Sequence, residues 1–215
     1  MKKGSGKTVS VRRRVPPKPL AETSVGPAVN SVFLVGFMGA GKSSVGRALG
    51  QRLNWIFEDL DDRIQAREGR TVAEIFRDAG ESEFRRAEHA ALQHVLQELQ
   101  GGAAKVVALG GGAFVQKQNA SLLQASRLPV VFLDAPVDEL WQRCCSQAAE
   151  NGTLRPLLRS KEQFSQLYET RRKNYSAASL TIQTGSRMVE SIAAEIAETL
   201  GLKEIALRTE QGEVE

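Results

Sequence analysis

The sequence predicts an α/β fold with three layers, in which helices cover both faces of a five-stranded parallel β-sheet. Two observations favour it. Short apolar runs alternate with segments of helical length between residues 31 and 200. In addition, the apolar run Val32–Val35 leads through a glycine-rich turn into a helical segment. A strand followed by a helix and then by another strand forms a right-handed crossover, and repeated crossovers build a parallel sheet.

The first half of this region contains two apolar runs of strand length and several helical segments. Gly69 and Gly80 stand where helices end, and Thr71 is a suitable N-cap for the helix that follows it. The predicted strands are Val32–Val35 and Trp55–Phe57, and the predicted helices are Lys42–Leu53, Asp61–Glu68, Val72–Asp78 and Glu81–Gln100.

The second half continues the alternation. The predicted strands are Val106–Leu109, Val130–Leu133 and Leu180–Gln183, and the predicted helices are a connection before the fourth strand, Val137–Ser146, Glu162–Tyr175 and Arg187–Leu200. The polar stretch Gln147–Arg159 has no regular period and is the place for a mobile lid. The residues from Leu202 onward are charged, and we expect them to be frayed.

Charge is distributed unevenly along the 215 residues. Residues 1–30 contain seven Lys or Arg and one Glu, a net charge of +6, so the remaining residues carry −2 of the overall +4. We expect a disordered basic arm at residues 1–30, one folded domain at residues 31–200 and a charged tail at residues 201–215. An organelle transit peptide is an alternative interpretation of the arm. The slightly acidic body argues against general nucleic-acid binding.

The cysteines and histidines exclude two further classes of protein. Cys144 and Cys145 are adjacent and could close only a strained ring, so the chain offers no disulfide framework. We interpret them as packing residues in a reducing compartment and expect a cytoplasmic protein. His89 and His94 are five residues apart, which does not place them on one helix face, so no zinc-type site is predicted. No apolar run approaches the ~20 residues of a membrane span.

The glycine-rich turn has the sequence GFMGAGKS at Gly36–Ser43, which matches the pattern G-x-x-x-x-G-K-[ST]. Its glycines let successive N–H groups point at a phosphate chain, and the N-terminus of the following helix adds partial positive charge. Lys42 would reach the β- and γ-phosphates, and the Ser43 hydroxyl would bind Mg²⁺. A turn that binds nothing is the alternative, which the flanking strand and helix disfavour. A similar string at Gly4–Thr8 has no strand before it and is rejected.

Two carboxylates follow the second predicted strand. Asp59 and Asp61 are two residues apart and would lie next to the phosphate-binding turn, because ligands of a parallel sheet bind beyond the carboxyl ends of its strands. Beside Mg²⁺ and ATP, one carboxylate would hold the metal and the other would take the proton of an acceptor hydroxyl. A turn with an N-cap aspartate is the simpler interpretation of the same residues.

Arginines and glycines from distant segments complete the candidate site. Arg85 and Arg171 are suited to binding a carboxylate through two parallel hydrogen bonds, although a lone arginine is more often a solvated surface charge. Gly110–Gly112 follow the third strand and offer close backbone approach, or else form a loose turn. Arg155, in the predicted lid, would neutralise charge on the transferring phosphoryl group.

The order and spacing of these stretches resemble shikimate kinases, within the nucleoside-monophosphate-kinase-like group of phosphate-loop folds. The resemblance spans residues 31–200 and rests on the motifs GFMGAGKSSVG, FEDLD, GESEFRRAE, ALGGGA, TLRPLL and RRKNY. It implies a transferase that phosphorylates the 3-hydroxyl of shikimate with ATP and Mg²⁺, in aromatic amino-acid biosynthesis. It also implies a monomer that binds neither nucleic acid nor membrane.

The resemblance further implies a role for each matching position. Catalysis would rest on Lys42, Asp61 and Arg155, and the metal would be held by Ser43 and Asp59. Nucleotide binding is implied for Gly39, Ala40, Gly41, Lys42, Ser43, Ser44, Arg143, Arg155 and Arg187. Substrate binding is implied for Asp61, Arg85, Gly110, Gly111, Gly112 and Arg171, with Glu88 orienting Arg85 through an ion pair.

The chain departs from the family pattern in two places, and other functions stay open. Cys144–Thr153 is a few residues longer than usual, and Lys173 and Asn174 replace the usual proline and leucine before Tyr175. A gluconate or nucleotide kinase could use the same phosphate-binding turn. A non-catalytic sensor, whose arm contacts nucleic acid, is the alternative from a different class.

Overall fold

The computed structural model describes residues 30–151 and 160–205. Within these residues, five strands form one sheet in the order β2-β3-β1-β4-β5, and every neighbouring pair is parallel. This confirms the predicted fold class. The strands are β1 (Ser31–Val35), β2 (Ile56–Asp59), β3 (Lys105–Ala108), β4 (Val130–Asp134) and β5 (Leu180–Gln183).

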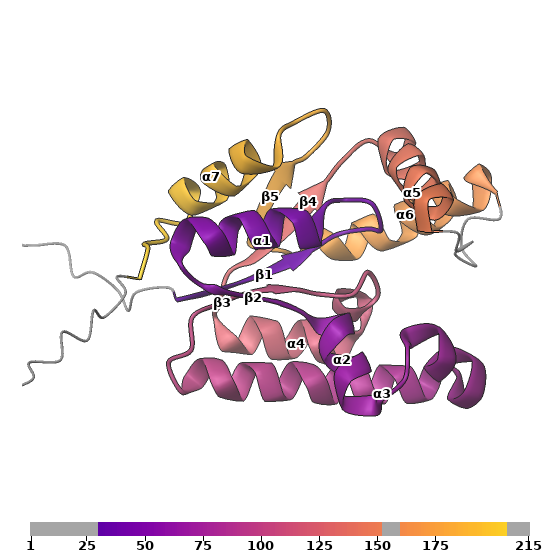
Figure 1. The fold of residues 1–215 in the computed structure, drawn as a ribbon, viewed down its shortest axis with the longest axis horizontal. Helices are drawn as coiled ribbons and strands as arrows, with labels where there is room; N and C mark the ends of the chain where they lie inside the picture. Colours follow the sequence, from indigo (N-terminus) through magenta and orange to yellow (C-terminus); the bar gives the residue numbers. More distant parts are fainter. Residues whose placement is uncertain (1–29, 152–159, 206–215) are drawn as a thin grey trace, which may run out of the picture.

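Helices cover the sheet on both sides (Figure 1). One side carries α1 and α7, and the other carries α3 and α4, whereas α2, α5 and α6 gather toward the end at which the strand arrows point. The helices are α1 (Lys42–Leu53), α2 (Leu60–Glu68), α3 (Val72–Gln100), α4 (Lys117–Ser126), α5 (Val137–Asn151), α6 (Lys161–Tyr175) and α7 (Val189–Thr199), with the 3₁₀ turn η1 (Ala113–Val115). None of the helices in the described ranges is long and apolar enough to span a membrane.

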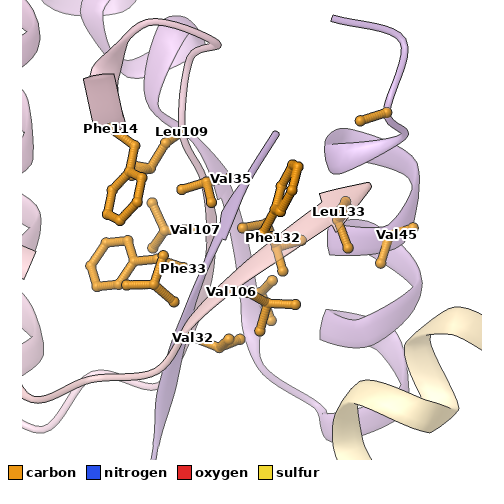
Figure 2. Close-up of a cluster of buried hydrophobic side chains, with 14 of the residues drawn as sticks. Val32, Phe33, Val35, Val45, Val106, Val107, Leu109, Phe114, Phe132 and Leu133 are labelled. Carbon is orange, nitrogen blue, oxygen red and sulfur yellow. The ribbon is translucent and has the colours of Figure 1, made fainter. Parts of the chain in front are cut away.

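The hydrophobic core is centred on β1, all five residues of which are buried. Figure 2 shows Phe33 and Val107 on one side of the sheet and Val45 and Leu133 on the other. A strand that is covered on both faces has apolar residues at every position. This explains why Val32–Val35 shows no alternation of apolar and polar residues. The backbone that leaves β1 therefore starts from a fully buried strand at the centre of the sheet.

The element α3 contains the two helices that the sequence predicts, separated at Gly80. Thr71 is the N-cap of the first of them, as expected. Its side-chain oxygen accepts from the N–H of Glu74, and the carboxylate of Glu74 accepts from the N–H of Thr71. Gly80 has φ 79° and ψ 174°, so the predicted break is present as a kink. The chain therefore changes direction at Gly80 between two helical segments, at the residue that the sequence marked as a helix end.

Two boundaries were predicted wrongly. Helix α5 continues to Asn151, so the irregular stretch expected from Gln147 does not begin there; residues 152–159, including Arg155, lie outside the described residues. Leu202 is buried and the N–H of Ile205 donates to the carbonyl of Leu53 at 3.0 Å, so the chain is not frayed from Leu202. Residues 1–29 and 206–215, in the predicted arm and tail, also lie outside the description.

An ion network fixes the edge of the sheet that carries the aspartates. The ammonium of Lys105 lies 2.6 Å from Glu58 and 2.5 Å from Glu98, and Arg63 also contacts both carboxylates. Hydrogen bonds from Arg63 and Lys105 lower the pKa of Glu98 to about 2. Because the network joins β2, α2, α3 and β3, it holds the turn after β2 against the rest of the sheet.

Candidate active site

The phosphate-binding loop follows β1 directly and ends at the N-terminus of α1. Gly36, Gly39 and Gly41 have φ values of 150°, 78° and 90°, which L-residues rarely adopt. Gly41 is the N-cap of α1, and no side chain caps this helix end. The orphan N–H groups of the first turn are therefore available to an anion.

Lys42 and Ser43 point in the directions that the motif requires. The ammonium of Lys42 donates to the carbonyl oxygens of Gly36 and Phe37, each at 3.0 Å, so the side chain folds back over the loop. The hydroxyl of Ser43 donates to Oδ2 of Asp59 at 2.8 Å. The loop and the end of β2 thus meet through a single hydrogen bond between hydroxyl and carboxylate.

Asp59 is compatible with both interpretations that the sequence left open. It is the last residue of β2, and its Oδ1 accepts from the N–H of Asp61 at 3.1 Å, so it is the N-cap of α2. Its other oxygen faces Ser43 at the phosphate-binding loop. The N-cap interpretation and the site interpretation are compatible, because each uses a different carboxylate oxygen.

Asp61 lies in the first turn of α2 and is half-buried. Its Oδ1 is enclosed and has no hydrogen-bond partner within the described residues. Desolvation raises the pKa of Asp61, the charge of Asp59 raises it further, and the positive charge of Lys42 opposes both effects. A partly desolvated carboxylate with a raised pKa is suited to accept a proton.

The three glycines after β3 lie between Asp61 and the two predicted arginines. A Cβ atom on Gly110 would lie 2.6 Å from Oδ1 of Asp61, and one on Gly112 would lie 2.7 Å from the guanidinium of Arg85. The carbonyl of Gly111 accepts from Nη1 of Arg171 at 3.3 Å. The structure therefore brings together residues from four separate segments, as the sequence predicted, and a Cβ atom at Gly110 or Gly112 would force Asp61 or Arg85 to shift.

Each arginine is fixed by contacts of its own. Arg85 donates to Glu88 at 2.9 Å and to Glu81 at 3.0 Å, which confirms the predicted ion pair with Glu88. The guanidinium of Arg171 lies 5.7 Å from the ring centre of Phe37 in the phosphate-binding loop. The two guanidinium groups thus approach the glycine turn from α3 and α6.

Glu88 carries a pH dependence of folding stability. Burial raises its pKa to about 7 from 4.5, although Arg85 opposes the shift. Because the folded state favours the protonated form, this contribution to stability is complete below pH 4.5 and is lost as the pH rises through about 7. We expect the free energy of unfolding to fall by on the order of 3 kcal/mol over this window.

Urea unfolding between pH 4.5 and 8 measures this loss. Glu88→Gln, which cannot ionise, should flatten most of the slope, and the remainder should come from Asp61, whose pKa is raised in the same direction. Equal slopes for the wild type and the variant would show that Glu88 does not titrate in this range.

Of the three arginines predicted to contact the nucleotide, the structure places one against the phosphate-binding loop. Arg143 donates to the carbonyl of Gly39 at 3.3 Å and also contacts Glu139 at 3.1 Å, so it lies against the phosphate-binding loop. Arg187 instead pairs with Glu195 at 2.5 Å, and the contacts described for it do not include the loop. Arg155 lies outside the described residues, so the structure does not place it.

Sequence reasoning did not single out three residues that shape the site. Tyr175 donates its hydroxyl to the carbonyl of Gly111, Glu81 shares Arg85 with Glu88, and Glu139 accepts from the N–H of Ser186 at 2.9 Å as well as from Arg143. Glu81 could have been found from its spacing, since it stands four residues before Arg85 on a predicted helix. The other two depend on contacts between distant elements, which leave no local pattern.

The donors at the loop fit a magnesium ion that is bound mainly through a nucleotide. Within residues 30–151 and 160–205, no group of three or more Cys, His, Asp or Glu side chains could hold a metal alone. The hydroxyl of Ser43, the carboxylate of Asp59 and the unpartnered oxygen of Asp61 are oxygen donors. Mg²⁺ commonly uses one or two such groups and fills its shell with waters and phosphates.

Two surface hollows of about 380 and 440 Å³ lie away from these residues. The first is lined by the ends of α4 and α7 and the start of β4, and the second by α1 and the start of β2. Neither hollow includes a predicted site residue.

Comparison with known proteins agrees with this geometry. The family model described as shikimate kinase matches residues 38–201. The chain belongs to the shikimate kinase family. The shikimate kinase of Streptomyces avermitilis is 41% identical over 179 residues, which cover 82% of this chain and 98% of that protein. The match to this shikimate kinase family member therefore extends over nearly the whole relative.

Solved structures support the same assignment. The structure of the shikimate kinase from Acinetobacter baumannii in complex with shikimate has a TM-score of 0.71 and 34% identity, covering 80% of this chain and 93% of that one. The shikimate kinase from Aquifex aeolicus has a TM-score of 0.68 and 31% identity, with 80% and 96% covered. Both confirm the shikimate kinase fold.

Proposed function

We propose that this chain phosphorylates the 3-hydroxyl of shikimate with ATP and so makes shikimate 3-phosphate and ADP. Membership of the shikimate kinase family supports the reaction class and the acceptor. The observation that carries the site assignment is the position of the Gly110–Gly112 turn. On one side the turn contacts Asp61, and the positive charge of Lys42 acts on the pKa of this carboxylate. On the other side the turn contacts Arg85 and Arg171.

The nucleotide half of the site is the loop before α1. The N–H groups of the residues from Gly39 to Ser44 and the N-terminus of α1 would hold the phosphates. Lys42, which donates to loop carbonyls, would exchange these bonds for phosphate oxygens. Arg143 would lie beside the base, and Arg155 and Arg187 are proposed to contact the nucleotide.

Magnesium, when bound, would neutralise charge on the β- and γ-phosphates. Ser43 and Asp59 would hold it, directly or through water, because their hydroxyl and carboxylate oxygens already meet at 2.8 Å. The protein contributes few ligands of its own, which suits an ion that arrives with ATP.

The acceptor half selects a hydroxylated carboxylate. Arg85 and Arg171 would bind the carboxylate, because guanidinium groups match its two oxygens. Asp61 would accept the hydroxyl proton while the acceptor oxygen bonds to the γ-phosphorus and the bond to the leaving oxygen of ADP breaks. We also propose that the protein acts as a cytoplasmic monomer.

An assay of ADP release tests the function. Purified full-length protein with ATP, Mg²⁺ and shikimate should turn over, and gluconate or nucleoside monophosphates in place of shikimate should not. Faster turnover with gluconate or a nucleotide would favour the neighbouring kinases that share the phosphate-binding loop. DNA binding that disappears when residues 1–30 are deleted, without turnover of shikimate, would instead favour the sensor.

A further inference from the structure

A buried carboxylate outside the reaction scheme lies at the end of β4. Asp134 is the last residue of this strand and is only 3% exposed. Its Oδ1 accepts from the hydroxyl of Tyr168 at 2.7 Å, and its Oδ2 accepts from Arg172 at 2.8 Å and Gln183 at 3.3 Å. Three donors on one buried carboxylate make a strong attachment point.

Two of these donors and two residues of the acceptor site come from the same helix. Tyr168 and Arg172 are one turn apart on α6, and both reach Asp134. Arg171 and Tyr175 are also one turn apart on α6, and both reach the carbonyl of Gly111. Residues four apart lie on one helix face, so α6 presents one face to the end of β4 and another to the turn after β3.

The strand order makes this arrangement a bridge over the phosphate-binding loop. β3 and β4 are the two neighbours of β1, from which the loop emerges. Between the two attachments, the ring of Phe37 in the loop packs edge-on against Tyr168, with ring centres 5.6 Å apart, and faces the guanidinium of Arg171. Helix α6 is thus attached both to the end of β4 and to the turn after β3. Between these two attachments it packs against Phe37 of the phosphate-binding loop.

The charge of Asp134 matters for the attachment. Burial alone would raise its pKa, but the hydrogen bonds from Arg172, Tyr168 and Gln183 outweigh burial and leave the pKa below its ordinary value. Without the negative charge, Arg172 would lose its charged partner, and the attachment of α6 to the end of β4 would rest on weaker contacts such as the hydrogen bond from Tyr168 to the carbonyl of Ala135 at 3.2 Å. The helix could then turn about its axis, and the guanidinium of Arg171 would move.

We propose that Asp134 is a positioning residue for acceptor binding, which holds α6 in the orientation that aims Arg171 at the substrate carboxylate. The proposal rests on the proposed function. It acts through Arg171 and not through the nucleotide, because the donors to Asp134 lie on the helix that carries Arg171. It therefore predicts a selective effect on one substrate.

Steady-state kinetics of Asp134→Asn tests this. The variant keeps the size of the side chain and removes its charge. We expect the KM for shikimate to rise at least about tenfold, the typical cost of losing a hydrogen bond to a charged group. The KM for ATP and kcat should stay within about twofold, since Lys42 keeps its hydrogen bonds to the loop carbonyls and Ser43 keeps its hydrogen bond to Asp59.

A double-mutant cycle separates positioning from loss of stability. In an Arg171→Ala background, Asp134→Asn should leave the KM for shikimate unchanged, yet it should lower the melting temperature as it does alone. Asp138→Asn is the matched control. Asp138 is an exposed carboxylate on α5 that also pairs with α6, through Lys161 at 2.7 Å. It should change neither quantity appreciably.

Three outcomes would overturn the proposal. They are an unchanged KM for shikimate in Asp134→Asn, equal rises in both KM values, or full additivity with Arg171→Ala. If Asp134→Asn does not fold, Arg172→Gln replaces it, because Arg172 is the half-exposed partner of Asp134. This variant must then raise the KM for shikimate without raising the KM for ATP. Wild-type turnover of shikimate is measured separately, so failure of the variant pattern with an active wild type rejects this inference alone.

Discussion

Asp61→Asn is expected to lower kcat about 10²- to 10⁴-fold while ATP binding stays nearly unchanged. The amide has the shape of the carboxylate but cannot accept the hydroxyl proton. Nucleotide binding should survive because Lys42 donates to carbonyl oxygens of the loop and Ser43 donates to Asp59. Turnover of shikimate and binding of a fluorescent ATP analogue measure the two quantities independently.

The control for this variant is Asp62→Asn. Asp62 is the next residue in the first turn of α2 and is exposed, so the substitution changes charge near the site without reaching it. Wild-type activity should also rise with pH along a limb shifted above the ordinary range of an aspartate, because burial raises the pKa of Asp61. A variant that retains kcat, or that loses ATP binding in parallel, would assign Asp61 another role.

Arg85→Ala is expected to raise the KM for shikimate by about 10²-fold or more, because truncating one partner of a buried charged contact typically costs 2–5 kcal/mol. The KM for ATP should change little. Part of the cost is indirect, since removal of Arg85 leaves Glu88 buried without its cation and favours its protonation. Calorimetric titration with shikimate measures the loss directly.

A second variant separates the loss of shikimate binding from the cost of leaving Glu88 buried without its cation. In Arg85→Ala with Glu88→Gln, the buried carboxylate is also removed, so the melting temperature should recover but shikimate binding should not. Arg86→Ala is the adjacent control, since Arg86 points to solvent with 74% of its side chain exposed. Recovery of shikimate binding in the double variant would mean that Arg85 serves only to neutralise Glu88.

The sequence determined the parts of this protein that depend on neighbours along the chain. The phosphate-binding loop was predicted because strand, glycines and helix follow one another within about a dozen residues, and the helix α1 has the predicted bounds. Thr71 was predicted as a cap because capping uses residues three apart. Asp61, Arg85 and Arg171 could be named from their motifs, and the structure places them around one turn.

The tertiary structure alone decided how these parts are arranged and supported. The strand order places β3 and β4 on either side of β1, and so lets α6 bridge the loop, but strand pairing depends on contacts between residues far apart in sequence. The attachment of Tyr168 and Arg172 to Asp134 and the free oxygen of Asp61 arise only once those strands are packed. Local sequence patterns indicate which side chains are reactive. Burial and long-range hydrogen bonds determine where those side chains point and which charge they carry.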